Sequence, residues 1–137
     1  MKGGGSIATG YVKVYAHEID ERPVEGALVR IYRTEDNLQY LEQEFYTDGN
    51  GMTPNIALEA PDQSLSLHLH HTKQPYATYD IELSKDGYDI EERRSIQIFE
   101  TVSSTLDMEM RQNAGVTQRR IVQVTPHRLY DQGEYYA

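Results

Sequence analysis

Two histidines spaced two residues apart form the clearest metal-binding pattern in the sequence. His68 and His70 lie in an alternating run at residues 64–71, so their side chains share one face of a predicted strand. Zn²⁺ takes such a pair together with a third ligand from elsewhere, but no motif supplies that ligand, and His71 points to the opposite face. We interpret the run as a polar strand face whose other side carries a core row, Leu65, Leu67 and Leu69.

The tetrapeptide Asp48-Gly49-Asn50-Gly51 resembles the beginning of a calcium-binding loop. Such a loop needs glycine at its sixth position, and Thr53 stands there instead. Glycine and asparagine readily adopt the positive φ angles of tight hairpin turns. The tetrapeptide is therefore predicted to close a β-hairpin.

The remaining charged residues form no recognisable catalytic pattern. Glu91 and Glu92 precede Arg93 and Arg94, which is typical of a solvated strand or sheet edge. The chain has no cysteine, which excludes thiolate nucleophiles, thiolate zinc sites and disulfides, and it has no nucleophile-elbow or phosphate-loop motif. We predict no catalytic residues, no cofactor-binding residues, no cofactor and no metal ligands, and we expect that the protein is not an enzyme.

Length and charge narrow the class of protein. The 137 residues fit one domain, and the net charge of −9 argues against nucleic acid, whose phosphates need a cationic surface. No run of apolar residues is long enough to span a membrane, and the N-terminus lacks the apolar core of a signal peptide. We expect synthesis in the cytoplasm and a final location in a spore, cell-surface or extracellular assembly.

Short alternating runs separated by turns indicate an all-β fold. Val12, Val14 and Ala16 share one face of the first run, and turn residues recur about every eight to twelve positions. This pattern predicts an antiparallel, seven- to eight-stranded Greek-key sandwich. The expected organisation is a flexible lead at 1–9, a sandwich domain at 10–111 and a strand-forming C-terminal tail at 112–137. The predicted strands of the sandwich cover residues 10–17, 24–33, 38–47, 52–60, 64–71, 76–83, 89–100 and 101–110.

The order of several segments carries a family resemblance. GYVKVYA, PVEGALVRIY, TDGNGMT, YDIELSKDGY and TLDMEM follow one another as in a carboxypeptidase-regulatory-like domain, which is a transthyretin-like or CnaB-like β-sandwich. Residues 75–82, Gly87-Tyr88 and residues 97–99 resemble the Firmicute versions in spore- and cortex-associated proteins. The resemblance covers about residues 10–111. It implies a non-catalytic accessory, stalk, adhesion or assembly module.

The C-terminal tail is the predicted site of function. RRIVQVT at residues 119–125 has a strand pattern beyond the finished sandwich, so its backbone must either cover an edge of its own sheet or add to the sheet of a neighbour. Tyrosine is also abundant, with eleven residues against two phenylalanines and no tryptophan, and it favours contact surfaces. The predicted assembly contacts are Arg119, Arg120, Ile121, Val122, Gln123, Val124, Tyr130, Tyr135 and Tyr136.

These observations lead to two predicted functions. The first is a non-catalytic structural subunit that self-associates through its terminal arms into a filament, shell or surface assembly, with copies of itself as partners and a cell-envelope or spore setting. The second is an accessory module that binds cell wall, carbohydrate or protein.

Overall fold

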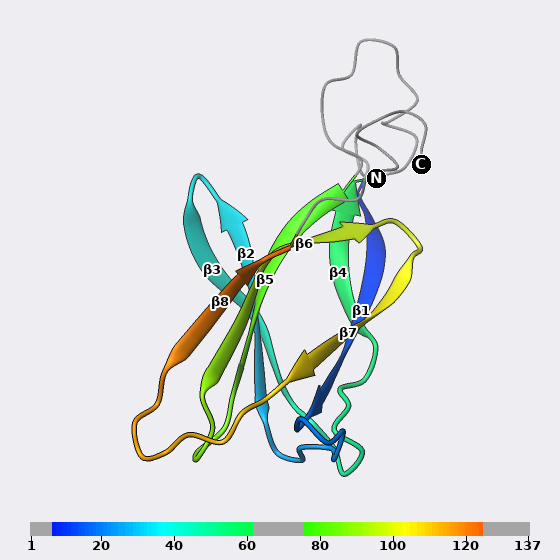
Figure 1. Cartoon of the computed structure of the whole chain (residues 1–137). Helices are drawn as coiled ribbons and strands as arrows, with labels where there is room; N and C mark the ends of the chain where they lie inside the picture. The colour runs from blue at the N-terminus through cyan, green and yellow to red at the C-terminus, as the bar shows by residue number, and fades with distance from the viewer. Residues whose placement is uncertain (1–6, 62–75, 125–137) are drawn as a thin grey trace, which may run out of the picture.

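Eight strands in two sheets make up the described part of the protein. The computed structural model describes residues 7–61 and 76–124, and these residues form strands and turns without a helix (Figure 1). The predicted all-β, seven- to eight-stranded sandwich is thus confirmed, while the predicted strand at 64–71, with His68 and His70, lies outside the described residues. The strands are β1 (Ile7–His17), β2 (Leu28–Glu35), β3 (Leu38–Tyr46), β4 (Ile56–Pro61), β5 (Tyr76–Ser84), β6 (Ile90–Phe99), β7 (Ser103–Glu109) and β8 (Arg119–Gln123).

The two sheets are mixed rather than purely antiparallel. One has the order β4-β1-β7 and the other β3-β2-β5-β6-β8. β2 pairs with both β3 and β5, while β4 belongs to the opposite sheet, so strands that are not consecutive become neighbours, as a Greek key requires. The prediction of antiparallel pairing was wrong for β1 with β7 and for β6 with β8, which are parallel. Both parallel partners arrive by connections that cross from one sheet to the other, which permits parallel pairing.

The core lies between the sheets and follows the alternation in the sequence. Side chains on every second residue of each strand point inward, and their neighbours point to the outer face. Gly10 lets the end of β6 approach β1, because a Cβ there would lie 2.3 Å from the carbonyl oxygen of Phe99. The buried core residues include Val12, Val14, Ala16, Val29, Ile31, Ile56, Ile81, Leu83, Ile96, Ile98, Met108 and Met110.

The turn between β2 and β3 has the geometry that its sequence favours. Asp36 and Asn37 both have positive φ, at 53° and 65°, and they are the only residues between the paired ends Glu35 and Leu38. Positive φ at both central residues is the signature of the two-residue hairpin turn whose twist matches that of its strands. The strands predicted at 24–33 and 38–47 left a break between them, and the structure forms its turn in that break, at Asp36 and Asn37.

The turn at residues 48–51 forms, but it does not close a hairpin. Asp48 Oδ1 accepts hydrogen bonds from the backbone N–H groups of Asn50 and Met52 at 2.8 and 3.0 Å, as an aspartate-capped turn requires. The turn leads from β3 in the five-stranded sheet to β4 in the three-stranded sheet. The hairpin prediction was wrong because turn residues do not show which strands will pair.

Gly51 fixes this turn against β1. Its φ is +75°, and a Cβ at this position would lie 2.4 Å from the backbone oxygen of Ala16. Its own carbonyl oxygen accepts a hydrogen bond of 2.7 Å from Ala16 N–H. The close approach therefore depends on the absence of a side chain.

A buried histidine links β1 to β7. His17 Nδ1 donates to the carbonyl oxygen of Glu18 at 2.8 Å, and Nε2 bonds the carboxylate of Asp107. Its ring stacks on Tyr15 with centroids 4.9 Å apart. Burial by itself lowers the pKa of His17, but the Glu18 carbonyl and the Asp107 carboxylate outweigh burial and raise this pKa above its ordinary value.

We expect Gly51→Ala to destabilise the protein more than Gly26→Ala. Both glycines have positive φ, at 75° and 77°, so both variants carry backbone strain of about 1–2 kcal/mol. Only the Cβ added at position 51 would also clash with β1, since nothing lies within 4 Å of a Cβ at Gly26, and this clash adds about 1–3 kcal/mol. Urea denaturation of both variants measures the difference, and equal losses would contradict the close approach.

We expect the contribution of His17 to stability to fall as the pH rises. A raised pKa in the folded state means that the charged His17–Asp107 pair stabilises fully below the ordinary pKa of 6.5 and is lost as the pH rises through the folded value. The difference in unfolding free energy between the wild type and His17→Gln is therefore larger at about pH 5.5 than at about pH 8.5. A difference that is independent of pH, measured by urea denaturation, would refute this coupling.

Candidate functional site

Four carboxylates are buried on the two central strands of the five-stranded sheet. Asp80 and Glu82 lie on β5, and Glu91 and Glu92 lie on β6, with exposed fractions of 5, 8, 0 and 3%. The prediction that Glu91 and Glu92 belong to a solvated strand or edge was therefore wrong. The reason is that β8 pairs with β6 and becomes the edge strand in its place.

An arginine of β8 neutralises the pair of carboxylates on the outer face. Glu82 and Glu92 lie opposite each other in the register of β5 and β6. Arg119 Nη1 donates to both, at 2.7 Å to Glu82 and 2.8 Å to Glu92, and Arg94 Nε donates to Glu92 at 2.8 Å. Burial raises the pKa of Glu92, but the hydrogen bonds from Arg94, Gln39 and Arg119 outweigh burial and hold it below its ordinary value.

The next residue of β8 neutralises the carboxylate on the inner face. Arg120 Nε donates to Glu91 Oε1 at 3.1 Å, and Arg93 Nη1 donates to the same oxygen at 3.1 Å. Consecutive residues of a strand point to opposite faces, so Arg119 and Arg120 attach β8 to carboxylates on both sides of the sheet. Two of the predicted assembly contacts thus form ion pairs within the molecule.

The tail strand covers an edge of its own sheet and presents a new one. Val124 N–H donates to the Arg94 carbonyl at 2.9 Å, and its side chain packs against the core. Ile121 and Val122 keep exposed side chains, and no strand within residues 7–61 and 76–124 pairs with the outer edge of β8. Tyr130, Tyr135 and Tyr136, the other predicted contacts, lie outside the described residues.

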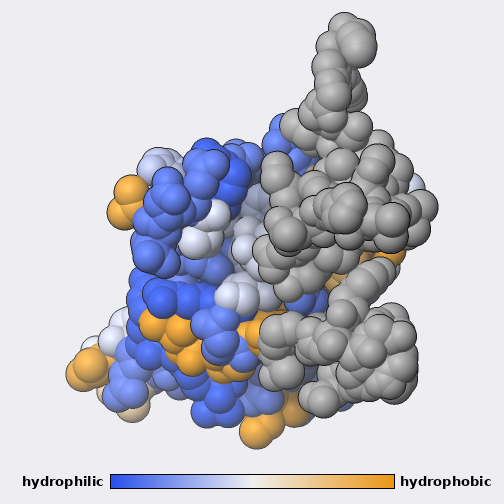
Figure 2. Space-filling view, turned by 90° about the horizontal axis from the view of Figure 1, so that it is seen from above, coloured by the Kyte–Doolittle hydropathy of each residue, from blue (hydrophilic) through white to orange (hydrophobic). Residues whose placement is uncertain are grey.

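The opposite edge of the same sheet is formed by β3. No strand pairs with its outer side in the described part of the chain. Four large side chains on this strand are exposed, namely Leu38, Tyr40, Leu41 and Tyr46. The end of the sandwich seen from above is largely hydrophilic, with separate hydrophobic patches on its described surface (Figure 2). Exposed apolar side chains therefore gather on the two edge strands of the five-stranded sheet, since β8 exposes Ile121 and Val122.

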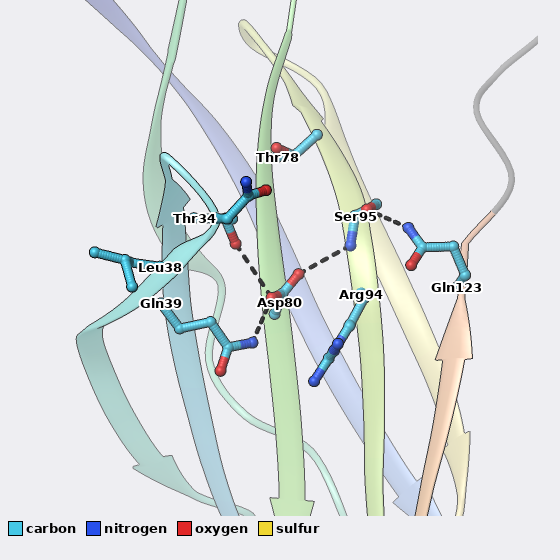
Figure 3. Close-up of a pocket in the computed structure, with 9 residues that line it drawn as sticks. Thr34, Leu38, Gln39, Thr78, Asp80, Arg94, Ser95 and Gln123 are labelled. Carbon is cyan, nitrogen blue, oxygen red and sulfur yellow. Dashed lines mark hydrogen bonds between the residues drawn. The ribbon is translucent and has the colours of Figure 1, made fainter.

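A polar groove opens on the outer face of this sheet between β3 and β8 (Figure 3). Its volume is about 430 Å³. Asp80 lies in its floor and accepts three hydrogen bonds, at 3.1 Å from Thr34 Oγ1, 2.5 Å from Gln39 Nε2 and 3.0 Å from Ser95 N–H. Gln123, the last residue of β8, donates to Ser95 Oγ (Figure 3). The groove is thus built from strands β2, β3, β5, β6 and β8.

A bulge in β6 creates the donor that faces Asp80. The register between β5 and β6 shifts between Tyr79 and Ile81, and Ser95 on the opposing strand has a φ of 65°. Bulges of this kind re-aim a backbone group within a sheet. This groove was not predicted from the sequence. The available signal was the spacing of Asp80 and Glu82, two carboxylates that alternate with Tyr79, Ile81 and Leu83.

The described residues contain neither a metal-binding cluster nor a membrane-spanning helix. Residues 7–61 and 76–124 hold no group of three or more histidine or acidic side chains placed to bind a metal ion. The same residues include no helix with the length and apolar character needed to cross a membrane. His68 and His70, which we weighed as a metal-binding pair and interpreted as a polar strand face, lie outside this part of the chain.

Comparisons with known proteins identify shared folds. No family model and no curated relative matches the sequence. Among solved structures, 3-chlorocatechol 1,2-dioxygenase from Rhodococcus opacus 1CP is 13% identical, with a TM-score of 0.51, over 82% of this chain and 63% of that one. Catechol 1,2-dioxygenase from Acinetobacter sp. ADP1 is also 13% identical, with a TM-score of 0.51, over 90% of this chain and 60% of that one. A streptococcal ancillary pilin is 14% identical, with a TM-score of 0.50, over 81% of this chain and 34% of that one.

These matches correct the expectation that the protein is not an enzyme. Several of the structures that share its sandwich are catechol or chlorocatechol dioxygenases, so the fold does not set the chain apart from enzymes. The chain spans less than two thirds of the length of these dioxygenases. Identities of 13–14% show a common fold alone, and the fold hosts different functions on different sites.

We expect Arg119→Met to destabilise the protein by about 1–2 kcal/mol, because Glu82 and Glu92 stay buried while losing a shared donor. This is less than for a fully buried pair, since the Arg119 side chain is 42% exposed. Arg22→Met, which removes an exposed pair with Asp20, serves as the control and is expected to change stability little. Chemical denaturation compares the two variants.

The pH dependence of the Arg119→Met effect provides a second readout. Because the folded pKa of Glu92 is lowered, its stabilising interactions are present above the ordinary pKa of 4.5 and are lost as the pH falls through the folded value. The deficit of Arg119→Met should therefore shrink in acid. A deficit that does not change with pH would contradict the ion-pair account.

Proposed function

We propose that this chain is a structural β-sandwich module that self-associates by continuing its five-stranded sheet from one copy to the next. In this assembly, β8 of one copy pairs with β3 of its neighbour. The observation that carries the proposal is that these two strands are the edges of one sheet and are unpaired on their outer sides within the described residues.

The directions of the strands suit such an assembly. Three antiparallel pairings separate β3 from β6, and β8 is parallel to β6, so β8 runs opposite to β3. A neighbour that keeps the same orientation therefore places its β3 antiparallel to β8, which is the more stable pairing. A contact between two different edges leaves one edge of each kind free, and its repetition builds a filament.

The side chains on the two edges are complementary. Arg119 and Arg120 use part of their donors internally, yet their side chains remain 42 and 43% exposed. β3 carries Glu42 and Glu44, which are also partly exposed. Opposite charges that meet across an interface set its register and disfavour wrong partners. Exposed apolar residues on both strands, including Leu41 and Ile121, supply area that association would bury.

The setting that this proposal implies is a surface assembly. The streptococcal ancillary pilin has a similar fold, which supports a structural role. Under the proposal, the final location is a spore, a cell surface or an extracellular assembly, the partners are copies of the chain and other envelope or spore components, and the family is that of the carboxypeptidase-regulatory-like sandwiches. The terminal tyrosines Tyr130, Tyr135 and Tyr136 are proposed as additional contacts.

Blocking each edge separately tests the proposal. Val124 N–H points to β6, so by alternation the N–H groups of Val122 and Val124 face β6 and that of Ile121 faces outward. Ile121→Pro removes an outward donor and retains pairing with β6, as edge strands tolerate proline. Leu41→Lys places a positive charge on β3, where it would meet the arginines of β8. We expect each variant alone to be monomeric by analytical ultracentrifugation, and a 1:1 mixture to form dimers through the two intact edges.

One control variant and two contradicting results complete this test. Val116→Lys changes an exposed apolar residue outside the strands, and it should assemble like the wild type. A Leu41→Lys variant that still dimerises by itself would show β8 paired with β8 and would overturn the proposed contact. Normal filaments from Ile121→Pro in negative-stain micrographs would exclude the β8 edge.

A second candidate function is that of a binding module. The specific observation that favours it is the polar groove on the outer face, which has a volume in the range of small-molecule sites. This groove opens on the face of the sheet, and its lining residues on the edge strands β3 and β8 include Leu38 and Gln123. Pairing through the outer backbone groups of the edges leaves that face open.

A further inference from the structure

We infer that the groove around Asp80 binds a neutral polyhydroxylated ligand, that is, a glycan. The inference rests on the binding role proposed above and specifies its ligand class. It is independent of self-association through the sheet edges.

The charged groups of the groove balance one another. Asp80 accepts three hydrogen bonds from the protein, which fix its position and satisfy most of its capacity. Arg94, the cation of the groove, donates to Glu92 at 2.8 Å. The described lining thus carries one anion and one cation, Asp80 and Arg94, which attract each other, so its formal charges cancel and it favours a neutral ligand over an anionic or a cationic one.

The hydrogen-bonding capacity that remains is mixed. The Gln39 and Gln123 side-chain nitrogens donate within the protein, and their amide oxygens accept no hydrogen bond from the described residues. The Thr78 hydroxyl also has no partner there and points toward the groove (Figure 3). A sugar hydroxyl both donates and accepts, so it satisfies amide oxygens and threonine hydroxyls together.

The groove also offers an apolar contact and polar groups that are held in place. Leu38, at the rim, is 57% exposed and supplies an apolar contact for the C–H face of a ring. The polar groups stand on strands of one sheet, where the Asp80 hydrogen bonds hold Gln39 and Thr34 in place before any ligand arrives. Such pre-organisation reduces the entropy lost on binding.

Titration of the full 137-residue chain with defined oligosaccharides tests the inference. The probes are neutral chitohexaose and cellohexaose, an anionic galacturonate hexamer and a cationic glucosamine hexamer, followed by ¹⁵N-resolved NMR. We expect a neutral hexamer to shift the amide signals of Thr78, Ser95 and Gln123, and the charged hexamers to bind more weakly. Gln123→Ala and Thr78→Val should each weaken binding about tenfold, as the loss of one hydrogen bond predicts.

Controls separate the possible outcomes. Gln118→Ala removes an exposed amide from the same tail without touching the groove, and it should bind like the wild type. Tighter binding of either charged hexamer at these residues would overturn the assignment of a neutral ligand while leaving a binding role in place. The absence of any shift from all four probes would overturn both. Ultracentrifugation of the same samples reports self-association separately, and unchanged thermal melts show that the variants fold.

Discussion

The ion pairs between β8 and the central strands determine how the rest of the sheet is arranged. A buried carboxylate that lacks a partner destabilises a fold by several kcal/mol. Strands β5 and β6 bury four carboxylates, and each of them therefore needs a partner. Arg119 and Arg120 reach three of these groups from a single strand, with Arg119 bonded to Glu82 and Glu92 on one face of the sheet and Arg120 bonded to Glu91 on the other. The C-terminal strand is therefore required for the charge balance of the sandwich, and its pairing moves the edge of the sheet from β6 to β8.

The ion pairs of β8 with the central strands also define the surface on which function is proposed. Because β8 is held from both faces, its outer edge is a fixed row of backbone groups rather than a free arm. The bulge at Ser95 adds a second local feature, since it directs a backbone donor at Asp80 and lets Gln39 and Thr34 complete the floor of the groove. The edge thus arises from ion pairs on both faces of the sheet, and the groove arises from polar groups on the outer face. The apolar core sets only the sandwich that carries them.

The sequence was sufficient where structure follows from local pattern. Alternation identified the core residues Val12 and Val14, and the break between the strands predicted at 24–33 and 38–47 located the turn that forms at Asp36 and Asn37. Prediction from the sequence failed where the structure depends on contacts between residues that are far apart in the chain. Glu91 and Glu92 were predicted to be solvated because no neighbouring residue in the sequence indicates that residues 119–123 will cover them. Likewise, the turn residues at 48–51 do not indicate that the strands on either side belong to different sheets. The groove was missed for the same reason, since five strands contribute to it.

Gln123 connects the two proposed functions through a single strand. It ends β8 and also lines the groove, where it donates to Ser95. Self-association by addition to β8 leaves this contact intact, so every copy in a filament keeps a complete groove. Self-association by exchange of the tail would instead require a neighbour to supply both the arginines for Glu82 and Glu91 and the amide at the groove. Addition requires less rearrangement than exchange, because the ion pairs formed within each copy are never broken. It yields an assembly that repeats the glycan site along one face.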